Sequence, residues 1–242
     1  MMAPMRIQWP GQPHQPRPRI PLSAEERVVG LDEAGRKAKS EFWLRGALVG
    51  RASWNPDGSP HMAVGVRQGV EVGHRLEYHE DGTIYAEPFV EGVLHGLAKQ
   101  YHPDGTLLIV SPFRNGTGTD CWCDLNGTLA EERPMKAGKP SGIERWWDED
   151  QRTVYSEMHW QDGKWHGIRR QWANGRLLPG FPEFFLLGKK VSKRAYLRKG
   201  MLEPDVPRYR SEDDAPEREF PEAFLRLQQR ARRLNSRRVP SR

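Results

Sequence analysis

Glycine recurs along this chain at intervals of 22 to 25 residues and marks the same point of a repeating unit. One series contains Gly35, Gly58, Gly82, Gly105, Gly127 and Gly175, with Asp150 in the slot between the last two. A second series contains Gly46, Gly69, Gly92, Gly116, Gly138, Gly163 and Gly188. Periods of this length are typical of stacked repeat architectures, which usually present an extended binding surface.

The repeating unit combines an aromatic residue with an Asp-Gly turn four residues later. The best preserved copies are 54–58, 78–82 and 101–105, which read WNPDG, YHEDG and YHPDG. Asp-Gly between apolar, alternating segments favours a β-hairpin, because glycine accepts a positive φ without steric cost. We therefore predict an all-β fold, an elongated and twisted antiparallel sheet of about six or seven hairpin repeats, with a short C-terminal helix.

This pattern resembles the MORN repeat, and its irregular form resembles the bacterial MORN-variant proteins described as antitoxins. The closest stretches are Gln161–Gly167 and Glu91–Gly96, and the resemblance covers roughly residues 27–192. It implies a non-enzymatic scaffold that binds a protein partner. The most specific form of this expectation is an antitoxin or immunity protein that sequesters a toxin.

Composition divides the chain into four segments. We expect a flexible proline-rich lead over 1–26, the MORN-like array over 27–192, a basic then acidic capping or linker segment over 193–219, and a basic amphipathic helix and tail over 220–242. The net charge of +6 is unevenly spread, because residues 220–242 alone carry seven Arg and one Glu. The array itself is mildly acidic.

Two cysteines are too few for a disulfide framework, and no apolar stretch approaches the ~20 residues that span a bilayer. We therefore expect a cytoplasmic protein. Cys121 and Cys123 fall on one face of a strand, where they suit buried positions better than metal binding, since a structural zinc needs four ligands. We expect no catalytic residues, metal or cofactor.

Aromatic residues at the position before each turn form the first candidate binding site. They either pack along the sheet or, where exposed, contact the partner. An exposed aromatic patch would mark an interaction surface. The proposed partner-binding rings are Trp54, Tyr78, Tyr101, Trp146 and Trp172.

A second candidate site is basic and lies towards the C-terminus. Its side chains can block edge-to-edge strand pairing or bind an acidic partner. The residues are Lys189, Lys190, Lys193, Arg194, Arg198, Lys199, Arg230 and Arg233. They support an alternative function, attachment to nucleic acid or an anionic membrane. Carbohydrate binding by the Trp and Tyr hairpins is a third possibility, and the oligomeric state is left open.

Overall fold

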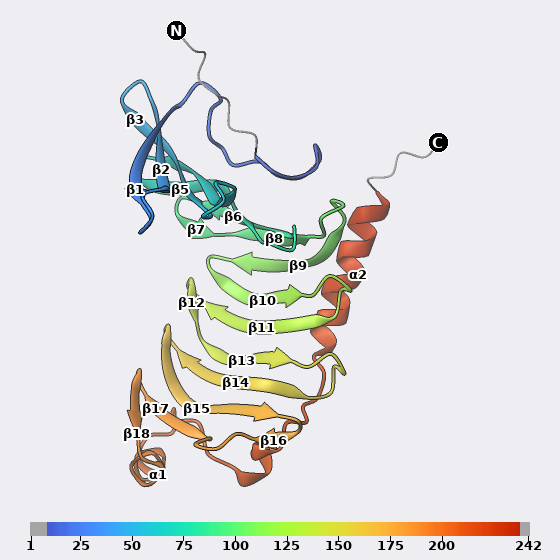
Figure 1. Cartoon of the computed structure of the whole chain (residues 1–242). Coiled ribbons are helices and arrows are strands. Elements are labelled where there is room, and N and C mark those ends of the chain that lie inside the picture. The colour runs from blue at the N-terminus through green and yellow to red at the C-terminus, as the bar shows by residue number, and fades with distance from the viewer. Residues whose placement is uncertain (1–8, 238–242) are drawn as a thin grey trace. The chain divides into compact units, whose positions relative to one another are not determined.

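The computed structural model describes residues 9–237. These residues form two compact lobes, the first made of residues 9–112 with 231–237 and the second of residues 113–230. Antiparallel strands fill both lobes, and this confirms the predicted all-β class with a short C-terminal helix (Figure 1). The extreme ends of the proposed lead and tail, 1–8 and 238–242, lie outside the described residues.

In the first lobe, consecutive strands pair antiparallel as a meander, and β6 pairs with both β7 and β8. The strands are β1 (Glu25–Leu31), β2 (Lys37–Leu44), β3 (Ala47–Trp54), β4 (Pro60–Arg67), β5 (Val70–Tyr78), β6 (Ile84–Val90), β7 (Val93–Leu94) and β8 (Gly96–Tyr101). The next strand, β9 (Leu107–Arg114), ends in the second lobe.

The second lobe continues the same pattern. Its strands are β10 (Thr117–Cys123), β11 (Leu129–Lys136), β12 (Lys139–Pro140), β13 (Gly142–Trp147), β14 (Val154–Gln161), β15 (Lys164–Ala173), β16 (Arg176–Leu177), β17 (Glu183–Leu186) and β18 (Lys189–Val191). Helix α1 (Lys193–Leu202), the 3-10 helix η1 (Ser211–Asp214) and helix α2 (Glu222–Ser236) follow. Helix α1 lies within the segment that the sequence analysis described only as a basic cap and linker.

Two kinds of turn alternate along the meander, and they explain the two glycine series. In the Asp-Gly turns, the aspartate side chain accepts hydrogen bonds from a residue two positions later, as Asp81 does from the Thr83 amide at 2.9 Å. Gly82 then adopts φ +82°. In the second series each glycine follows another residue with positive φ, as in Glu91-Gly92, which is the pattern of a two-residue type I′ turn.

Successive type I′ turns are hydrogen-bonded to one another. The amide of Gly92 donates to the carbonyl of Glu71 at 3.0 Å, and that of Gly138 donates to Gly116 at 2.9 Å. A Cβ on Gly116 would lie 2.4 Å from the Gly138 nitrogen. The close approach of these two turns therefore requires glycine at position 116.

One face of the sheet, here called the covered face, is packed under segments from outside the strands. In the first lobe, the lead crosses this face within residues 9–24. Trp9 stacks on Trp54 with ring centroids 6.0 Å apart. A Cβ on Gly50 would lie 2.5 Å from Ile20. The lead thus supplies part of the core, although the sequence analysis described it as flexible.

In the second lobe, residues 203–229 lie against the covered face. Phe220 packs on Trp147 with ring centroids 5.4 Å apart, and Phe224 packs on Phe220. The Gln228 side chain donates to the Gly127 carbonyl at 2.6 Å. The proposed linker and the part of the amphipathic helix up to residue 230 are therefore integral parts of this lobe.

The turn geometry predicts a specific cost for replacing Gly82. A valine there must adopt φ +82°, and its Cβ would lie 3.1 Å from Pro103. We expect Gly82→Val to lower the free energy of unfolding by about 1–3 kcal/mol in a urea titration. Gly82→Asn is the control, because asparagine enters the left-handed region more readily. A valine variant as stable as the asparagine variant would contradict the role of φ.

Candidate binding surface

The aromatic row that precedes the turns is mostly buried on the covered face. Trp54, Tyr78, Tyr101 and Trp172 are 9%, 6%, 1% and 4% exposed. Trp54 also donates from Nε1 to the Ser40 hydroxyl at 2.9 Å, and Trp172 donates from Nε1 to the Asp214 carbonyl at 2.7 Å. Partner binding by these rings stays a hypothesis that would require the lead or the C-terminal segment to move aside.

Trp146 occupies a different place from the rest of the row. Counted from the turn at Gly58, the fifth turn has Gln151 as its left-handed residue, with φ 55°, and Trp147 is the ring four positions before it. Trp147 is 3% exposed on the covered face, whereas Trp146 lies half-buried on the opposite face beside Tyr155. The glycine register alone could not locate this one-residue shift, because no glycine is present in the turn.

Tyr78 borders a pocket of about 620 Å³ in the first lobe. Segment 10–12 of the lead and the turns around Pro56 and Gly82 line the pocket. The Tyr78 hydroxyl has no hydrogen-bond partner among the described residues, and burial raises its pKa. At Tyr78 a member of the aromatic row therefore borders a cavity.

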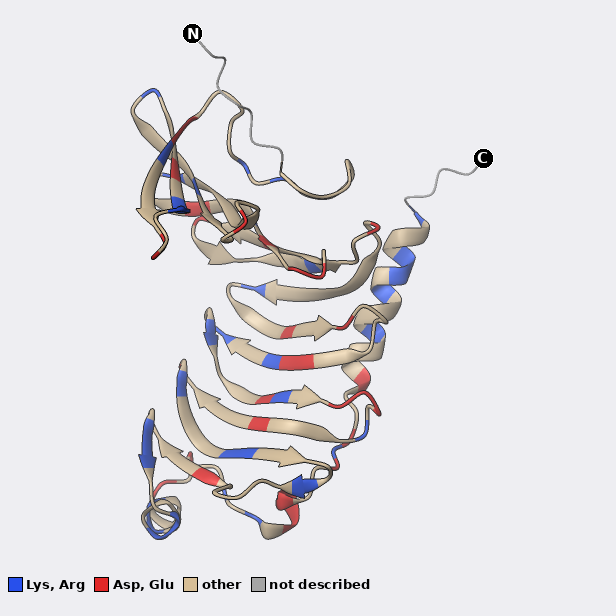
Figure 2. Cartoon of the chain, in the orientation of Figure 1, with Lys and Arg blue, Asp and Glu red and all other residues tan. Residues whose placement is uncertain are grey.

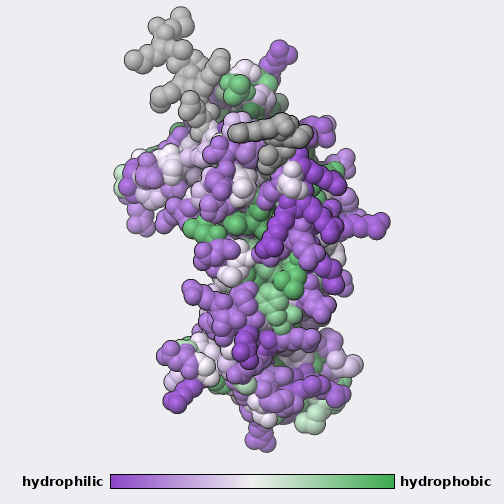
Figure 3. Space-filling model, turned by 90° about the vertical axis from the view of Figure 1, so that its right-hand side faces the viewer, coloured by the Kyte–Doolittle hydropathy of each residue, from purple (hydrophilic) through white to green (hydrophobic). Residues whose placement is uncertain are grey.

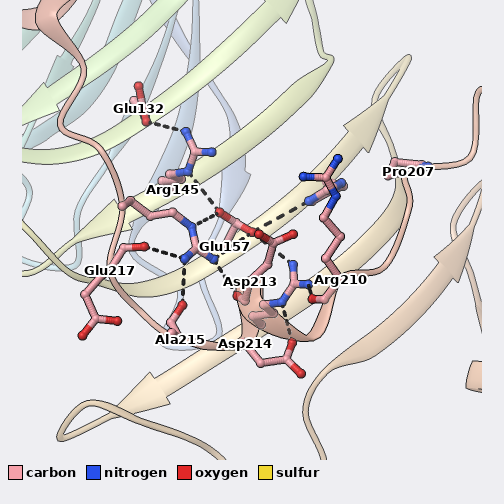
Figure 4. A network of polar contacts seen from close by, with 12 residues as sticks. Glu132, Arg145, Glu157, Pro207, Arg210, Asp213, Asp214, Ala215 and Glu217 are labelled. Carbon is pink, nitrogen blue, oxygen red and sulfur yellow. Dashed lines mark hydrogen bonds and ion pairs between the residues drawn. The ribbon is translucent and has the colours of Figure 1, made fainter.

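A network of buried ions joins the covered face of the second lobe to residues 203–219. Glu157, 3% exposed, lies among three guanidinium groups. Its oxygens lie 3.0 Å from Arg145 Nε, 3.2 Å from Arg170 Nη1 and 2.9 Å from Arg218 Nε. Figure 4 shows Glu157 and Arg145 with Asp213, Asp214 and Ala215 gathered around them.

This arrangement holds Glu157 in its ionised form. Burial alone would raise the pKa of the Glu157 carboxyl, but hydrogen bonding from nearby His159 and Arg218 and the charges of Arg218 and Arg145 outweigh burial, so the pKa lies well below its ordinary value. Arg170 is only 1% exposed and also pairs with Asp214 at 2.9 Å. The network therefore holds residues 203–219 against the covered face.

The opposite face of the sheet, here called the charged face, repeats a combination of arginine, carboxylate and aromatic ring. In the first lobe Arg75 lies 4.5 Å from the Phe89 ring centroid and 3.4 Å from Glu87. In the second lobe Arg169 lies 5.5 Å from the Trp165 ring centroid and 3.1 Å from Glu183. The Arg75 and Arg169 side chains are 29% and 28% exposed, so this face is accessible to solvent.

Asp120, Glu131, Arg133 and Glu144 extend the charged face over β10, β11 and β13. Arg133 lies 3.3 Å from Asp120 and 3.6 Å from Glu131. Burial raises the pKa of Glu131 to about 7, and Arg133 opposes the shift while Glu144 and Asp120 add to it. Sequence analysis missed this group because its members are spread over 25 residues and meet only through the strand register.

The predicted basic patch is solvent-exposed but divided between two places. Lys189 and Lys190 lie in β18, and Lys193, Arg194, Arg198 and Lys199 lie in α1. Arg230 and Arg233 lie in α2, where several positions along the ribbon are coloured as Lys or Arg (Figure 2). Lys190 pairs with Glu183 at 2.5 Å, Lys199 pairs with Glu203, and Lys193 lies 4.0 Å from the Tyr209 ring centroid. Figure 3 shows the side of the molecule that carries α2 as mostly hydrophilic, interrupted by apolar groups.

Cys121 and Cys123 are both buried and form no disulfide. Burial raises the pKa of the Cys123 thiol to about 12, so this thiol is neutral at physiological pH. Among residues 9–237, no group of three or more metal-ligating side chains could hold an ion. No helix within the same range has the length and apolar character needed to cross a membrane.

Comparison with protein families identifies the repeat. The family model described as a MORN repeat variant matches residues 94–115, which run from β7 through the Asp104-Gly105 turn to the type I′ turn at Asn115. Residues 94–115 therefore form a MORN-variant repeat, and the other hairpins reproduce its turn geometry. A search of curated proteins gives no match.

The buried ion network predicts that Glu157 contributes strongly to stability. Glu157→Gln leaves three arginines without their shared anion, and we expect a loss of about 3–5 kcal/mol at pH 7 by urea unfolding. Because the folded-state pKa is lowered, this contribution is present above the unfolded value near 4.5 and is lost as the pH falls. Glu222→Gln on exposed α2 is the control and should change stability by less than about 0.5 kcal/mol. An equal loss of stability in the two variants would contradict this role of the buried ion network.

The raised pKa of Glu131 predicts a pH dependence of stability opposite to that of Glu157. The folded-state pKa of Glu131 is raised above the ordinary 4.5 to about 7, so folding retains a proton that the unfolded chain releases, and stability falls as the pH rises between these values. We expect Glu131→Gln to exceed the wild type in stability by roughly 1–3 kcal/mol at pH 8, with little difference at pH 4. Thermal unfolding at the two pH values measures this, and a less stable variant at pH 8 would refute it.

Proposed function

We propose that this protein is a non-enzymatic scaffold that binds a protein partner through its charged face. The observation that supports this proposal is the recurrence of the same surface chemistry in both lobes. Arginine, carboxylate and aromatic side chains alternate there, at partial exposure, while segments of the chain itself occupy the covered face. Stacked repeats commonly bind partners over such repeated surfaces.

The sharper version is that the partner is a toxin and the scaffold acts as a cytoplasmic antitoxin or immunity protein. It is supported by the resemblance of the irregular glycine pattern to bacterial MORN-variant proteins described in that way. Charged and aromatic side chains on a preformed sheet suit this role, since rigid anchors bind with a small loss of conformational entropy.

A second candidate function is attachment to an anionic membrane or to nucleic acid. Helix α1 favours it, because Met201 and Leu202 are 79% and 75% exposed beside the cationic Arg198. Exposed apolar side chains with flanking basic residues suit an anionic lipid surface. The basic residues of α2 could add to the electrostatic attraction.

Two sets of substitutions separate these functions. Arg75→Gln with Arg169→Gln alters the charged face, whereas Lys189→Gln with Arg194→Gln and Arg198→Gln removes charge from the basic segment. We expect the first set to reduce capture of the native protein partner at least about tenfold and the second to leave capture unchanged. Affinity capture with quantitative mass spectrometry measures both, after circular dichroism has confirmed folding. The reverse result would favour the attachment function.

Co-expression tests the antitoxin role separately. If a toxin gene lies beside this one, the wild type and the basic-segment variant should restore growth, and the charged-face variant should not. Toxicity that persists with the wild type would reject this role while leaving other protein partners open.

A further inference from the structure

An aromatic frame surrounds one carboxylate on the charged face of the second lobe. Glu131 of β11 lies directly across from Trp122 of β10 and from Trp146 of β13 in the strand register. Tyr155 of β14 packs against Trp146 with ring centroids 6.2 Å apart and is 42% exposed. Both tryptophans are half-buried, so the frame borders solvent.

The charges within this frame are unbalanced. Asp120, Glu131 and Glu144 lie around the guanidinium of Arg133, and these four groups sum to a formal charge of −2 when all are ionised. Glu131 is 9% exposed, and its Oε1 accepts no hydrogen bond from any described residue. Oε2 of Glu144 also has no such donor, although its Oε1 accepts from Trp146 Nε1 at 2.9 Å.

Comparable carboxylates elsewhere in the same lobe are fully paired. Glu157 has three arginines, and Glu183 has both Arg169 and Lys190. A buried carboxylate that lies beside two other carboxylates and only one guanidinium is costly to the fold, and such local violations occur at functional sites. The surrounding rings favour the binding of a further cation, because the aromatic faces attract positive charge just as the carboxylates do.

We infer that the frame of Trp122, Trp146 and Tyr155 around Glu131 is a docking site for a cationic side chain of the protein partner. This inference rests on the proposed protein-binding function and specifies the chemistry of the partner. Arginine fits best, because its planar guanidinium can stack on an indole while donating to carboxylate oxygens. A small metal ion fits poorly, because indole rings offer no ligand atoms.

Binding should depend on the ionisation of Glu131. The groups that face it are Asp120 of β10, Arg133 of β11, Glu144 of β13 and Tyr155 of β14, and burial raises the pKa of the Glu131 carboxyl to about 7. Raising the pH from 6 to 8 converts most of the Glu131 population to the anion, so affinity for a cation should rise up to about tenfold.

The experiment uses the full-length protein and the peptide acetyl-Gly-Gly-Arg-Gly-Gly-amide, with a citrulline peptide as the neutral isostere. Nuclear magnetic resonance follows the Trp146 indole N–H signal, assigned with Trp146→Phe. We expect the arginine peptide to shift this signal, more strongly at pH 8 than at pH 6. Glu131→Gln should weaken binding at least fivefold at pH 8 and abolish the pH dependence. Glu222→Gln, an exposed carboxylate on α2 outside the frame, should bind as the wild type does.

The proposed site would be refuted if the citrulline peptide bound as tightly as the arginine peptide. It would also be refuted if Glu131→Gln and the control variant lost the same affinity for the arginine peptide. If Glu131→Gln fails to fold, the pH dependence of the wild type decides instead, and a flat profile refutes the inference. The peptide does not depend on the identity of the natural partner. Failure of the peptide together with continued partner capture through Arg75 and Arg169 would reject this site while leaving the scaffold function intact.

Discussion

A single-layer sheet cannot bury both of its faces by itself, and this constraint governs the structure of the whole chain. Large rings such as Trp54 and Trp147 gain about 1.5–3 kcal/mol or more when fully buried, but only if something covers them. The lead does so for Trp54 and the segment around Phe220 does so for Trp147. Residues 9–24 and 203–229 are therefore part of the core, and one face is left for other contacts.

Charge is distributed differently on the two faces of the second lobe. On the covered face, positive charge surrounds Glu157, and its pKa falls although it is buried. On the charged face, Glu131 is also buried but shares one guanidinium with two other carboxylates, and its pKa rises. The first arrangement is complete within the chain, whereas the second leaves room for positive charge from outside.

Features fixed by local backbone geometry could be predicted from the sequence. The Asp-Gly and Gly series located nearly every turn, because a positive φ selects glycine at each position separately. The fifth turn departs from this rule because Gln151 takes the left-handed position and is held by long-range bonds. Its side chain accepts from the Leu129 amide at 2.9 Å and donates to the Leu129 carbonyl at 3.0 Å. No pattern within one repeat contains that information, so the aromatic row was misassigned by one residue there.

Helix α1 and the Glu131 frame were missed for different reasons. Ser192 caps α1 by accepting from the Ala195 amide at 3.2 Å, and this serine was a usable signal that the surrounding lysines obscured. The Glu131 frame depends on which residues face one another across β10, β11 and β13, including an irregularity in register between Trp122 and Cys123. Strand registry of that kind is set by tertiary packing, so the glycine spacing could place the strands but could not identify the side chains that meet.

The two candidate surfaces attract opposite charges, and this distinguishes their partners. The basic segment of α1 and α2 attracts polyanions, and its binding weakens with salt because the charges are exposed. The frame around Glu131 attracts a cation in partly desolvated surroundings, where screening is weaker. A partner held at the frame must offer a positive side chain to the sheet, whereas a partner of the basic segment must offer negative charge to the helices. The sign of the partner's surface charge, more than the salt dependence alone, therefore decides which surface carries the function.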